Sequence, residues 1–213
     1  MEHFRVAVIA DLVDSKNISD RRLAQVSIAA AFARVDALVP HDQSMRATVG
    51  DEFQAVYSTI ARALEATLLA RLALPAGIDC RFGLGLGQVI DVGDGIAGSV
   101  QDGSGWWLAR DAINQAHARE DSRTPSIRAW FSAGDGDVAR ESLVNAYLLA
   151  RDHVVGSMTE RSRRLVFGSM LGSSQGELAE TEGITQSAVS QSLRRSGGAS
   201  LIASIEQLRA GGL

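Results

Sequence analysis

The chain has 213 residues, of which 46% are hydrophobic and 22% are charged, so it can bury a full core with room for a small second domain. Its net charge of −4 excludes a protein coated in nucleic acid along its whole length, although a local basic patch is compatible with it. A single cysteine, Cys80, excludes a disulfide framework. With no run of about 18 apolar residues and no secretion-signal pattern, we expect a soluble cytoplasmic protein with no membrane partner.

The first part of the chain alternates strand-like and helix-like segments. Residues 5–10 form a short apolar run rich in β-branched residues, which predicts a buried strand that ends at Asp11. Further on, Gly83, Gly85 and Gly87 share one face of a strand and leave space for something to approach the backbone. In chain order we expect a strand at 5–10, a polar loop at 11–20, a helix to about 38, a hairpin at 43–57, a helix at 59–74 and a strand at 78–86.

The middle of the chain continues this alternation after a glycine-rich interval. Residues 92–105 carry no periodic pattern and are predicted to form a loop. We then expect a helix at 106–119, a strand at 126–131 and a long helix beginning near Val138. Asp135 and Asp137 resemble a fragment of a calcium loop, but no glutamate follows at the required distance, so helix capping is the preferred interpretation.

The order β-α-β-β-α-β followed by α-β predicts a ferredoxin-like or palm α+β fold, with helices on one face of an antiparallel sheet. We place this palm domain at residues 1–134. A connecting helix at 135–157 leads to a small all-α domain at 158–213.

Two adjacent carboxylates, Asp51 and Glu52, follow Gly50 between two strand-like runs. The pattern predicts a hairpin with both carboxylates at its tip. In a palm fold this tip lies beside the end of the first strand, so Asp11 and Asp51 are expected to converge. Together with Glu52 and the main-chain carbonyl of Leu12, they form the predicted site for Mg²⁺ or Mn²⁺. An ordinary turn, with Asp11 as a capping residue, remains the alternative.

Phosphate-binding groups are expected next to these metal ligands. Asp14, Ser15 and Lys16 follow in the loop after the first strand, where main-chain amides and an ammonium group suit the phosphates of a nucleoside triphosphate or other nucleotide. A solvated loop explains the same residues nearly as well. Arg110, on the helix at 106–119, is a fourth candidate.

These segments resemble known families. The sequences around Asp11 and Asp51 look like the two metal motifs of class III nucleotidyl cyclases and the corresponding segments of GGDEF diguanylate cyclases. The resemblance to the SatD family covers most of the chain. It is carried by Ile-Ala-Asp-Leu-Val-Asp-Ser at 9–15, Gly-Asp-Glu-Phe-Gln at 50–54, and Asp-Gly-Ser-Gly-Trp-Trp-Leu-Ala-Arg-Asp-Ala-Ile at 102–113.

The departures from the cyclases bear on activity. Ala47 stands where adenylyl cyclases have a base-reading lysine, and Val49 replaces the first glycine of the GGDEF motif. Trp107 and Asp111, with Arg110 one place away, stand where a catalytic asparagine and arginine are expected. The resemblance therefore implies metal and phosphate binding more than base recognition or turnover. Because adjacent helical residues point about 100° apart, one of Trp106 and Trp107 should pack in the core and the other should serve a dimer or base-stacking contact.

The C-terminal segment has the spacing of a helix-turn-helix module. Gly183 is predicted to make the turn, and Ile184 to plug it. A preceding helix at 160–171, with three arginines, is expected to add positive charge, and a closing helix is expected near 201–209. The positions expected to pack inward are Leu178, Ala179, Val189 and Leu193. The residues expected to contact double-stranded DNA are Thr185, which also caps the recognition helix, Gln186, Ser187, Ser190, Gln191, Arg194 and Arg195.

Two functions follow from these patterns. The first is a DNA-binding transcriptional regulator, expected to be a homodimer, whose cyclase-like domain binds a metal and a nucleotide. The second is an active metal-dependent nucleotidyl cyclase or polymerase-like enzyme that is docked by its helical part. A helical part that binds protein or is purely structural is the alternative to DNA contact. The sequence names neither the nucleotide, nor the DNA target, nor the direction of regulation.

Overall fold

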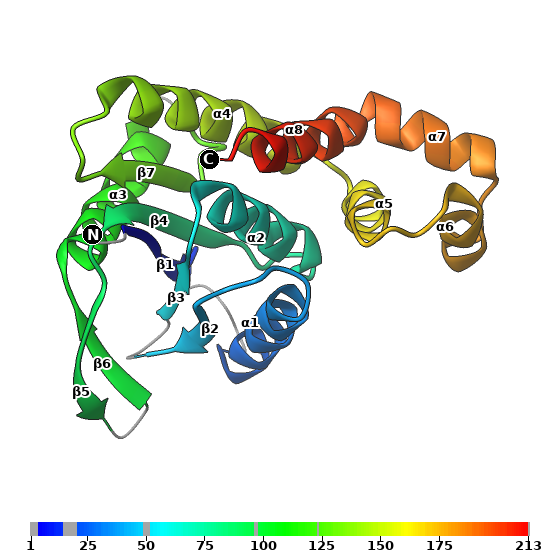
Figure 1. The fold of residues 1–213 in the computed structure, drawn as a ribbon. Helices are drawn as coiled ribbons and strands as arrows, with labels where there is room; N and C mark the ends of the chain where they lie inside the picture. Colours follow the sequence, from blue (N-terminus) through cyan, green and yellow to red (C-terminus); the bar gives the residue numbers. More distant parts are fainter. Residues whose placement is uncertain (1–3, 15–20, 49–51, 96–97, 123, 213) are drawn as a thin grey trace.

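The structure is a computed structural model that describes residues 4–14, 21–48, 52–95, 98–122 and 124–212. Its centre is a five-stranded sheet in the order β2-β3-β1-β4-β7 (Figure 1). The strands are β1 (Arg5–Leu12), β2 (Gln43–Ala47), β3 (Phe53–Tyr57), β4 (Cys80–Gly87) and β7 (Ala129–Ala133). The first four strands pair antiparallel, and β7 adds parallel to β4. The sheet is therefore mixed rather than purely antiparallel.

Helices cover both faces of this sheet. The helices are α1 (Arg21–Asp36), α2 (Ile60–Ala73), α3 (Ser104–Ser122) and α4 (Val138–Ser157). Alternate residues of β1 separate the two faces: Val8 belongs to the main core with α1 and α2, whereas Ile9 packs with Trp106 and Ile113 of α3. Figure 1 shows α1 and α2 side by side on their face. The prediction of one covered face was wrong, because α3 returns to the opposite side.

The glycines of β4 explain how α3 approaches the sheet. A Cβ at Gly83 would overlap the carbonyl of Ala109, and a Cβ at Gly85 would overlap the main chain of α3 at Gly105. The main chain of α3 therefore lies directly on the strand. The glycine face of β4 was expected to leave space for a close approach to the backbone, and the structure shows that α3 of the same chain occupies that space.

The glycine-rich interval forms a separate two-stranded hairpin, β5 (Ile90–Gly95) and β6 (Gly98–Asp102), which extends away from the sheet (Figure 1). The prediction of a loop was wrong here. In the described part of the chain, β5 and β6 pair with each other and not with the central sheet. Their sequences show little of the apolar alternation by which strands are predicted. Gly93, at a φ of 158°, lies at the irregularity between the two registers of the hairpin.

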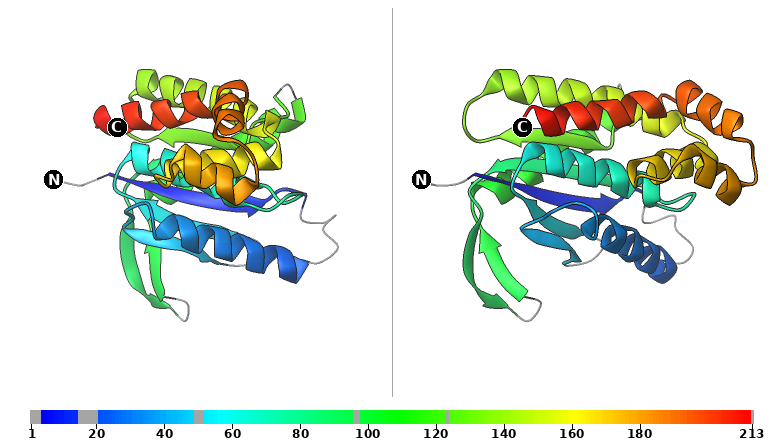
Figure 2. Two further views of the ribbon diagram at one scale, coloured as in Figure 1. Left: turned by 90° about the vertical axis from the view of Figure 1, so that its right-hand side faces the viewer. Right: turned by 45° about the vertical axis from the view of Figure 1, so that its right-hand side comes forward.

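Four helices follow α4: α5 (Glu160–Met170), α6 (Gln175–Glu182), α7 (Gln186–Arg195) and α8 (Gly198–Ala210). In Figure 2, α8 returns along α4, and its Arg209 forms an ion pair with Glu65 of α2. One hydrophobic core extends from Val6 in β1 to Ile205 in α8. The proposed boundaries at 134 and 157 stay predictions. Within the described ranges, no helix combines the length and hydrophobicity needed to cross a membrane.

Candidate functional site

The end of β1 and the start of β3 bring two predicted site residues together. Ala10 pairs with Phe53, so continuing this register by one residue places Asp11 opposite Glu52. Side chains alternate along a strand, and both residues follow the parity of Ile9 and Gln54, on the face covered by α3. The continued register therefore places two carboxylates on the same face of the sheet, at the end of β1 and just before β3.

Each of these carboxylates is neutralised by an arginine. Arg81, the cross-strand neighbour of Asp11 in β4, donates from Nη1 to both oxygens of Asp11 at 3.2 and 3.3 Å. Arg110 of α3 donates from Nη2 to Glu52 at 2.5 Å, and Gln54 donates to the other oxygen of Glu52 at 3.0 Å. The predicted phosphate ligand Arg110 is thus bound to a predicted metal ligand.

The remaining predicted ligands divide into two groups. Asp51, Ser15 and Lys16 lie outside the described residues. Leu12 is buried at the end of β1, and Asp14 is an exposed loop residue at a φ of 52°, a left-handed conformation that is uncommon outside glycine. In the part of the chain that the structure describes, no three His, Cys, Asp or Glu residues are grouped to hold a metal. Asp11 and Glu52 offer the hard oxygen ligands that Mg²⁺ prefers, but a metal there must compete with arginine.

Asp11 is one end of a continuous series of alternating charges. From Arg81 the series passes through Glu120 of α3 to Arg128, which precedes β7. It then runs to Asp79, which precedes β4. The consecutive ion pairs are Asp11–Arg81, Arg81–Glu120, Glu120–Arg128, Arg128–Asp79, Asp79–Arg71, Arg71–Asp152 and Asp152–Arg151. These pairs connect the predicted site to α2 and α4.

The inner end of this series is fully buried. Asp152 has no exposed surface and accepts hydrogen bonds from the main-chain N–H groups of Arg128 and Ala129, at 2.7 and 2.8 Å, as well as from Arg71 and Arg151. Burial alone favours neutral carboxylic acids and neutral bases. The hydrogen bonds that Asp152 accepts from Arg128 and Ala129 fix the start of β7 to α4.

The same competition sets the pKa of Asp79. Burial raises the pKa, but the charge and hydrogen bonds of Arg71, with the charges of Arg128 and Arg163, outweigh it and hold the pKa below its ordinary value. Asp79 therefore remains ionised at neutral pH. Asp79, Arg81 and Arg128 were not predicted from the sequence. The signal that could have marked them is charge at the start of two apolar strand-like runs, since Asp79 and Arg128 directly precede β4 and β7 and Arg81 is the second residue of β4.

A second candidate site lies on the C-terminal helices. Ser174 accepts from the main chain of Glu177, whose side chain accepts in return from Ser174, so α6 begins with a capping box. Gly183 ends the helix at a φ of 64°, and Ile184 donates from its main-chain N–H to the carbonyl of Ala179. This is the Schellman arrangement, and it turns the chain sharply into α7.

The start and inner face of α7 follow the prediction. Thr185 accepts from the main-chain N–H of Ala188 and caps the helix. Val189 and Leu193 are buried, as are Leu178 and Ala179 of α6. Of the predicted DNA-contacting residues, Ser190 is half-buried, and those exposed to solvent are Thr185, Gln186, Ser187, Gln191, Arg194 and Arg195.

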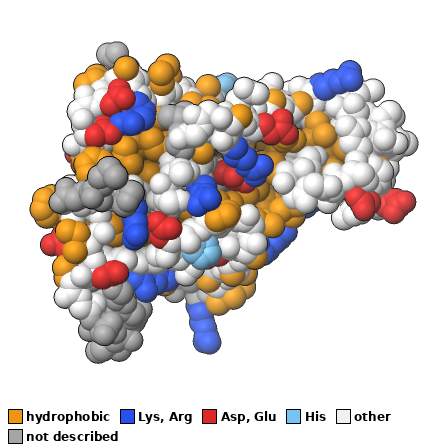
Figure 3. Space-filling model, in the orientation of Figure 1, with side chains coloured by type: hydrophobic (Ala, Val, Ile, Leu, Met, Phe, Trp, Pro, Cys, Tyr) orange, Lys and Arg blue, Asp and Glu red, His pale blue; other side chains and the backbone are white. Residues whose placement is uncertain are grey.

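Two of the three arginines of α5, Arg161 and Arg164, share the single carboxylate of Glu182, which offsets part of the predicted positive charge. Arg164 donates from Nε and Nη2 to Glu182 at 2.6 and 2.7 Å, and Arg161 lies 3.7 Å from the same carboxylate. Figure 3 shows basic side chains at the top of the right-hand end of the molecule, where α7 lies, and acidic ones at its lower edge, where α6 lies. The surface between them is mostly uncharged. The basic charge of this end therefore depends on Arg194 and Arg195.

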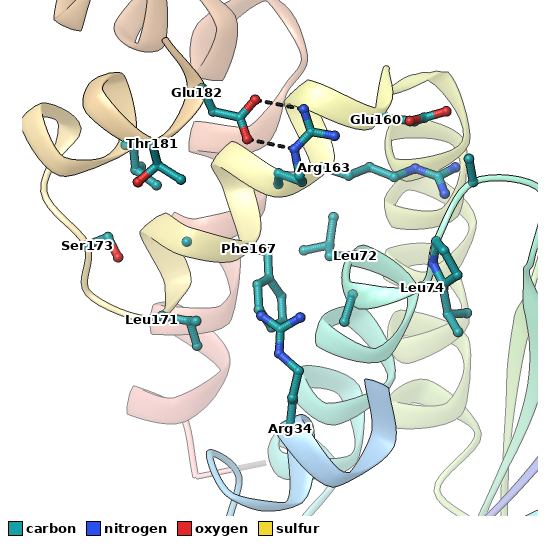
Figure 4. A pocket seen from close by; sticks show the side chains of 16 residues that line it. Arg34, Leu72, Leu74, Glu160, Arg163, Phe167, Leu171, Ser173, Thr181 and Glu182 are labelled. Carbon is teal, nitrogen blue, oxygen red and sulfur yellow. Dashed lines mark hydrogen bonds and ion pairs between the residues drawn. The ribbon is translucent and has the colours of Figure 1, made fainter. Parts of the chain in front are cut away.

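A pocket of about 500 Å³ separates α5 and α6 from α1 and the end of α2 (Figure 4). Arg34 of α1 lies over the ring of Phe167 of α5, 4.6 Å from its centre, and Glu182 closes the far side. Cation–π contacts of this kind contribute about 0.5–1 kcal/mol at exposed sites. The C-terminal helices thus contact the sheet domain through both apolar and charged groups.

The two tryptophans divide as predicted. Trp106 is buried with Ala7 and Ile9 against the sheet, whereas 67% of Trp107 is exposed on the outer side of α3. A partner for Trp107 stays a prediction. Asp137 caps α4 by accepting from the main chain of Arg140, which confirms its capping role.

These features define the class of the chain: an α+β fold in which a β-α-β-β-α-β unit is extended by α3, β7 and a set of C-terminal helices. The chain belongs to the SatD family, whose sequence profile matches residues 5–203. No curated protein matches it. Among solved structures, it is weakly similar to the catalytic core of a rhodopsin-guanylyl cyclase with converted specificity in complex with ATPαS. The identity is 18%, over 57% of this chain and 73% of that one, with a TM-score of 0.37.

Proposed function

We propose that this protein is a DNA-binding transcriptional regulator whose sheet domain binds a nucleotide together with Mg²⁺ or Mn²⁺. The observation that carries the DNA-binding part is the pair α6 and α7. Two capped helices joined by a tight turn bury one face and expose the other, as helix-turn-helix modules do. The ten residues of α7 span about 15 Å, a length that a major groove accommodates.

The exposed face of α7 has the chemistry of a recognition helix. Gln186 and Gln191 carry amides suited to base edges, and Arg194 and Arg195 carry charges suited to phosphates or guanine. One such module reads only a few base pairs, so a homodimer is expected to supply the second half of a DNA site.

The nucleotide part of the proposal is supported by the position of Asp11 opposite Glu52. Asp11, Asp51 and Glu52, with the carbonyl of Leu12, would hold the metal, which neutralises phosphate charge when bound. Metal binding would break the ion pair between Arg110 and Glu52. A metal ion that binds Glu52 displaces Arg110, which can then bind a phosphate group together with Asp14, Ser15 and Lys16.

DNA binding is tested by fluorescence anisotropy on labelled duplexes that cover the region upstream of the protein's own gene. Affinity should fall with salt, and the double variant Arg194→Ala/Arg195→Ala should bind more weakly, with a salt slope reduced by about 2. Arg22→Ala removes an exposed arginine of α1 and is the matched control. A complete lack of salt-sensitive affinity for any duplex removes the regulator function.

Nucleotide binding is tested separately by thermal-shift measurements with nucleotides and Mg²⁺ or Mn²⁺. A bound ligand raises stability by mass action, so wild-type protein should be stabilised and Asp51→Ala should not. A stabilisation of equal size in both proteins would place the nucleotide elsewhere.

The second candidate function is a metal-dependent nucleotidyl cyclase or polymerase-like enzyme. The carboxylates of Asp11 and Glu52 favour it, because two-metal phosphoryl transfer uses acidic residues on neighbouring strands. The discriminating measurement is turnover: sustained product from ATP or GTP with Mn²⁺, abolished by Asp11→Asn, would replace the sensor function by catalysis.

A further inference from the structure

Two open pockets adjoin each other at the end of the sheet where β1 finishes and β4 and β7 begin. Their volumes are about 390 and 460 Å³, and they share Asp79, Arg128 and Arg163. The loop after β1 and the turn before β4 line the first pocket, and the end of α4 lines the second. Arg163 comes from α5, so the sheet domain and the C-terminal helices both contribute to this space.

Arg163 differs from the other arginines of this region. Arg71, Arg81, Arg128 and Arg151 each form at least one ion pair with a carboxylate. Among the described residues, the half-buried guanidinium of Arg163 forms no ion pair and no hydrogen bond, and its Nε is buried without an acceptor. Native structures satisfy most buried donors, so an unsatisfied one calls for an explanation, and a bound anion is one.

The charges around Arg163 favour an anion as that partner. Burial lowers the pKa of Arg163, and repulsion from Arg71 and Arg128 lowers it further, although Asp79 and Glu160 act in the opposite direction. The carboxylate of Asp79 is already engaged by two guanidinium groups. An added anion would therefore be attracted by Arg163, which has no ion-pair partner among the described residues. It would be repelled little by Asp79, because Arg71 and Arg128 neutralise that carboxylate.

Arg128 offers a second donor. Its Nε donates to Asp79, and its Nη1 donates to the carbonyls of Pro125 and Ile127 and forms an ion pair with Glu120. Its Nη2 makes no hydrogen bond to another residue of the described ranges. Guanidinium groups bind oxyanions through two parallel N–H donors, so two arginines on one pocket match the oxygens of a phosphate.

We propose that these pockets form a binding site for an oxyanion of the phosphate type, held between Arg163 of α5 and Arg128 at the start of β7. The anion is either free phosphate or the phosphate group of a nucleotide. Asp14 lines the first pocket and His153 lines the second. Because α5 leads directly into α6 and α7, a bound anion joins the sheet domain to the helices proposed to contact DNA.

The test is a thermal-shift titration of full-length protein with inorganic phosphate, pyrophosphate, ATP and GTP. EDTA is present throughout, so the proposed metal-nucleotide site stays silent, and potassium chloride at equal ionic strength controls for screening. Phosphate should raise the Tm of wild-type protein, and Arg163→Gln should weaken the apparent affinity about tenfold or more. Saturation by a nucleotide at lower concentration than phosphate would identify the nucleotide as the source.

Two further variants separate binding from a structural role. Arg161→Gln, which changes an exposed arginine on the same helix, should keep the wild-type shift, and Arg163→Lys should keep part of it. Without added anion, Arg163→Gln should melt at or above the wild-type temperature, because it removes a half-buried charge whose Nε has no acceptor. A shift of equal size in wild type and Arg163→Gln, or one that chloride reproduces, overturns the proposal.

Discussion

The buried carboxylate of Asp152 should be the most costly single charge to remove. Asp152 lies between Arg71 and Arg151 and also accepts from two main-chain N–H groups at the start of β7. The side chains of both arginines are at most 2% exposed, so solvent cannot replace the lost partner. In Asp152→Asn the amide cannot neutralise either guanidinium, and its N–H₂ group meets donors where it needs acceptors.

The magnitude follows from the burial. Removing one partner of a buried ion pair costs about 3–5 kcal/mol, because the other charge stays buried and uncompensated. For a chain of this length each kcal/mol shifts the Tm by about 2–4 °C, so Asp152→Asn should melt roughly 6–20 °C below the wild type. The control is Asp42→Asn, which breaks the exposed pair with Arg5 and should cost about 1 kcal/mol or less.

Urea denaturation followed by circular dichroism measures both variants. The expected result is a clearly lower midpoint for Asp152→Asn, with the midpoint of Asp42→Asn near that of the wild type. If the free energies of unfolding of Asp152→Asn and Asp42→Asn differ by less than about 1 kcal/mol, the carboxylate of Asp152 does not stabilise the core in the way described.

Three further predictions test other parts of the fold. Gly85→Ala forces a Cβ into the main chain of α3 and should lower stability by about 1–3 kcal/mol or more, as seen by thermal melting. Gly183→Ala places a side chain at a φ of 64°, which should cost about 1–2 kcal/mol and separate α6 from α7; proteolysis of the C-terminal helices would reveal it. The third concerns the depressed pKa of Asp79: its folded pKa lies below the ordinary value of 3.8, so its contribution is present above pH 3.8 and is lost as the pH falls through the folded pKa. The stability gap between wild type and Asp79→Asn should thus be larger at pH 7 than at pH 3, and a gap independent of pH would contradict the pairing with Arg71.

Local patterns in the sequence predicted most of the helices. Asp137 and Thr185 cap the helices that they were expected to cap, and Gly183 makes the expected turn. Each of these features depends on contacts within a few residues, so a short window of sequence contains all the information. The division of Trp106 from Trp107 follows from helix geometry alone.

Long-range contacts were not predictable in the same way. Arg71 and Asp152 are 81 residues apart, and nothing near either residue identifies its partner. The position of α3 on the second face depends on the glycines of β4, which the sequence marks as a place of close approach without naming what approaches. The hairpin of β5 and β6 was not predicted, because its glycine-rich sequence carries no regular alternation of apolar and polar residues.

The predicted convergence of Asp11 and Asp51 is not tested, because Asp51 lies outside the described residues. The register of β1 and β3, continued by one residue beyond Ala10 and Phe53, places Asp11 opposite Glu52 instead. Their arginine partners, Arg81 and Arg110, were not anticipated in that role, because a carboxylate at a strand end carries no local sign of its counterion. Whether Asp51 completes the site stays a prediction.

We propose that a ligand in the sheet domain is coupled to DNA binding by α7. The coupling is measured as the Kd for a duplex with and without a nucleotide and Mg²⁺, in wild type and in Asp51→Ala. We expect a ligand-dependent change in the wild-type Kd that disappears in Asp51→Ala. A Kd unchanged by any nucleotide, in a protein that binds both ligands, would contradict it.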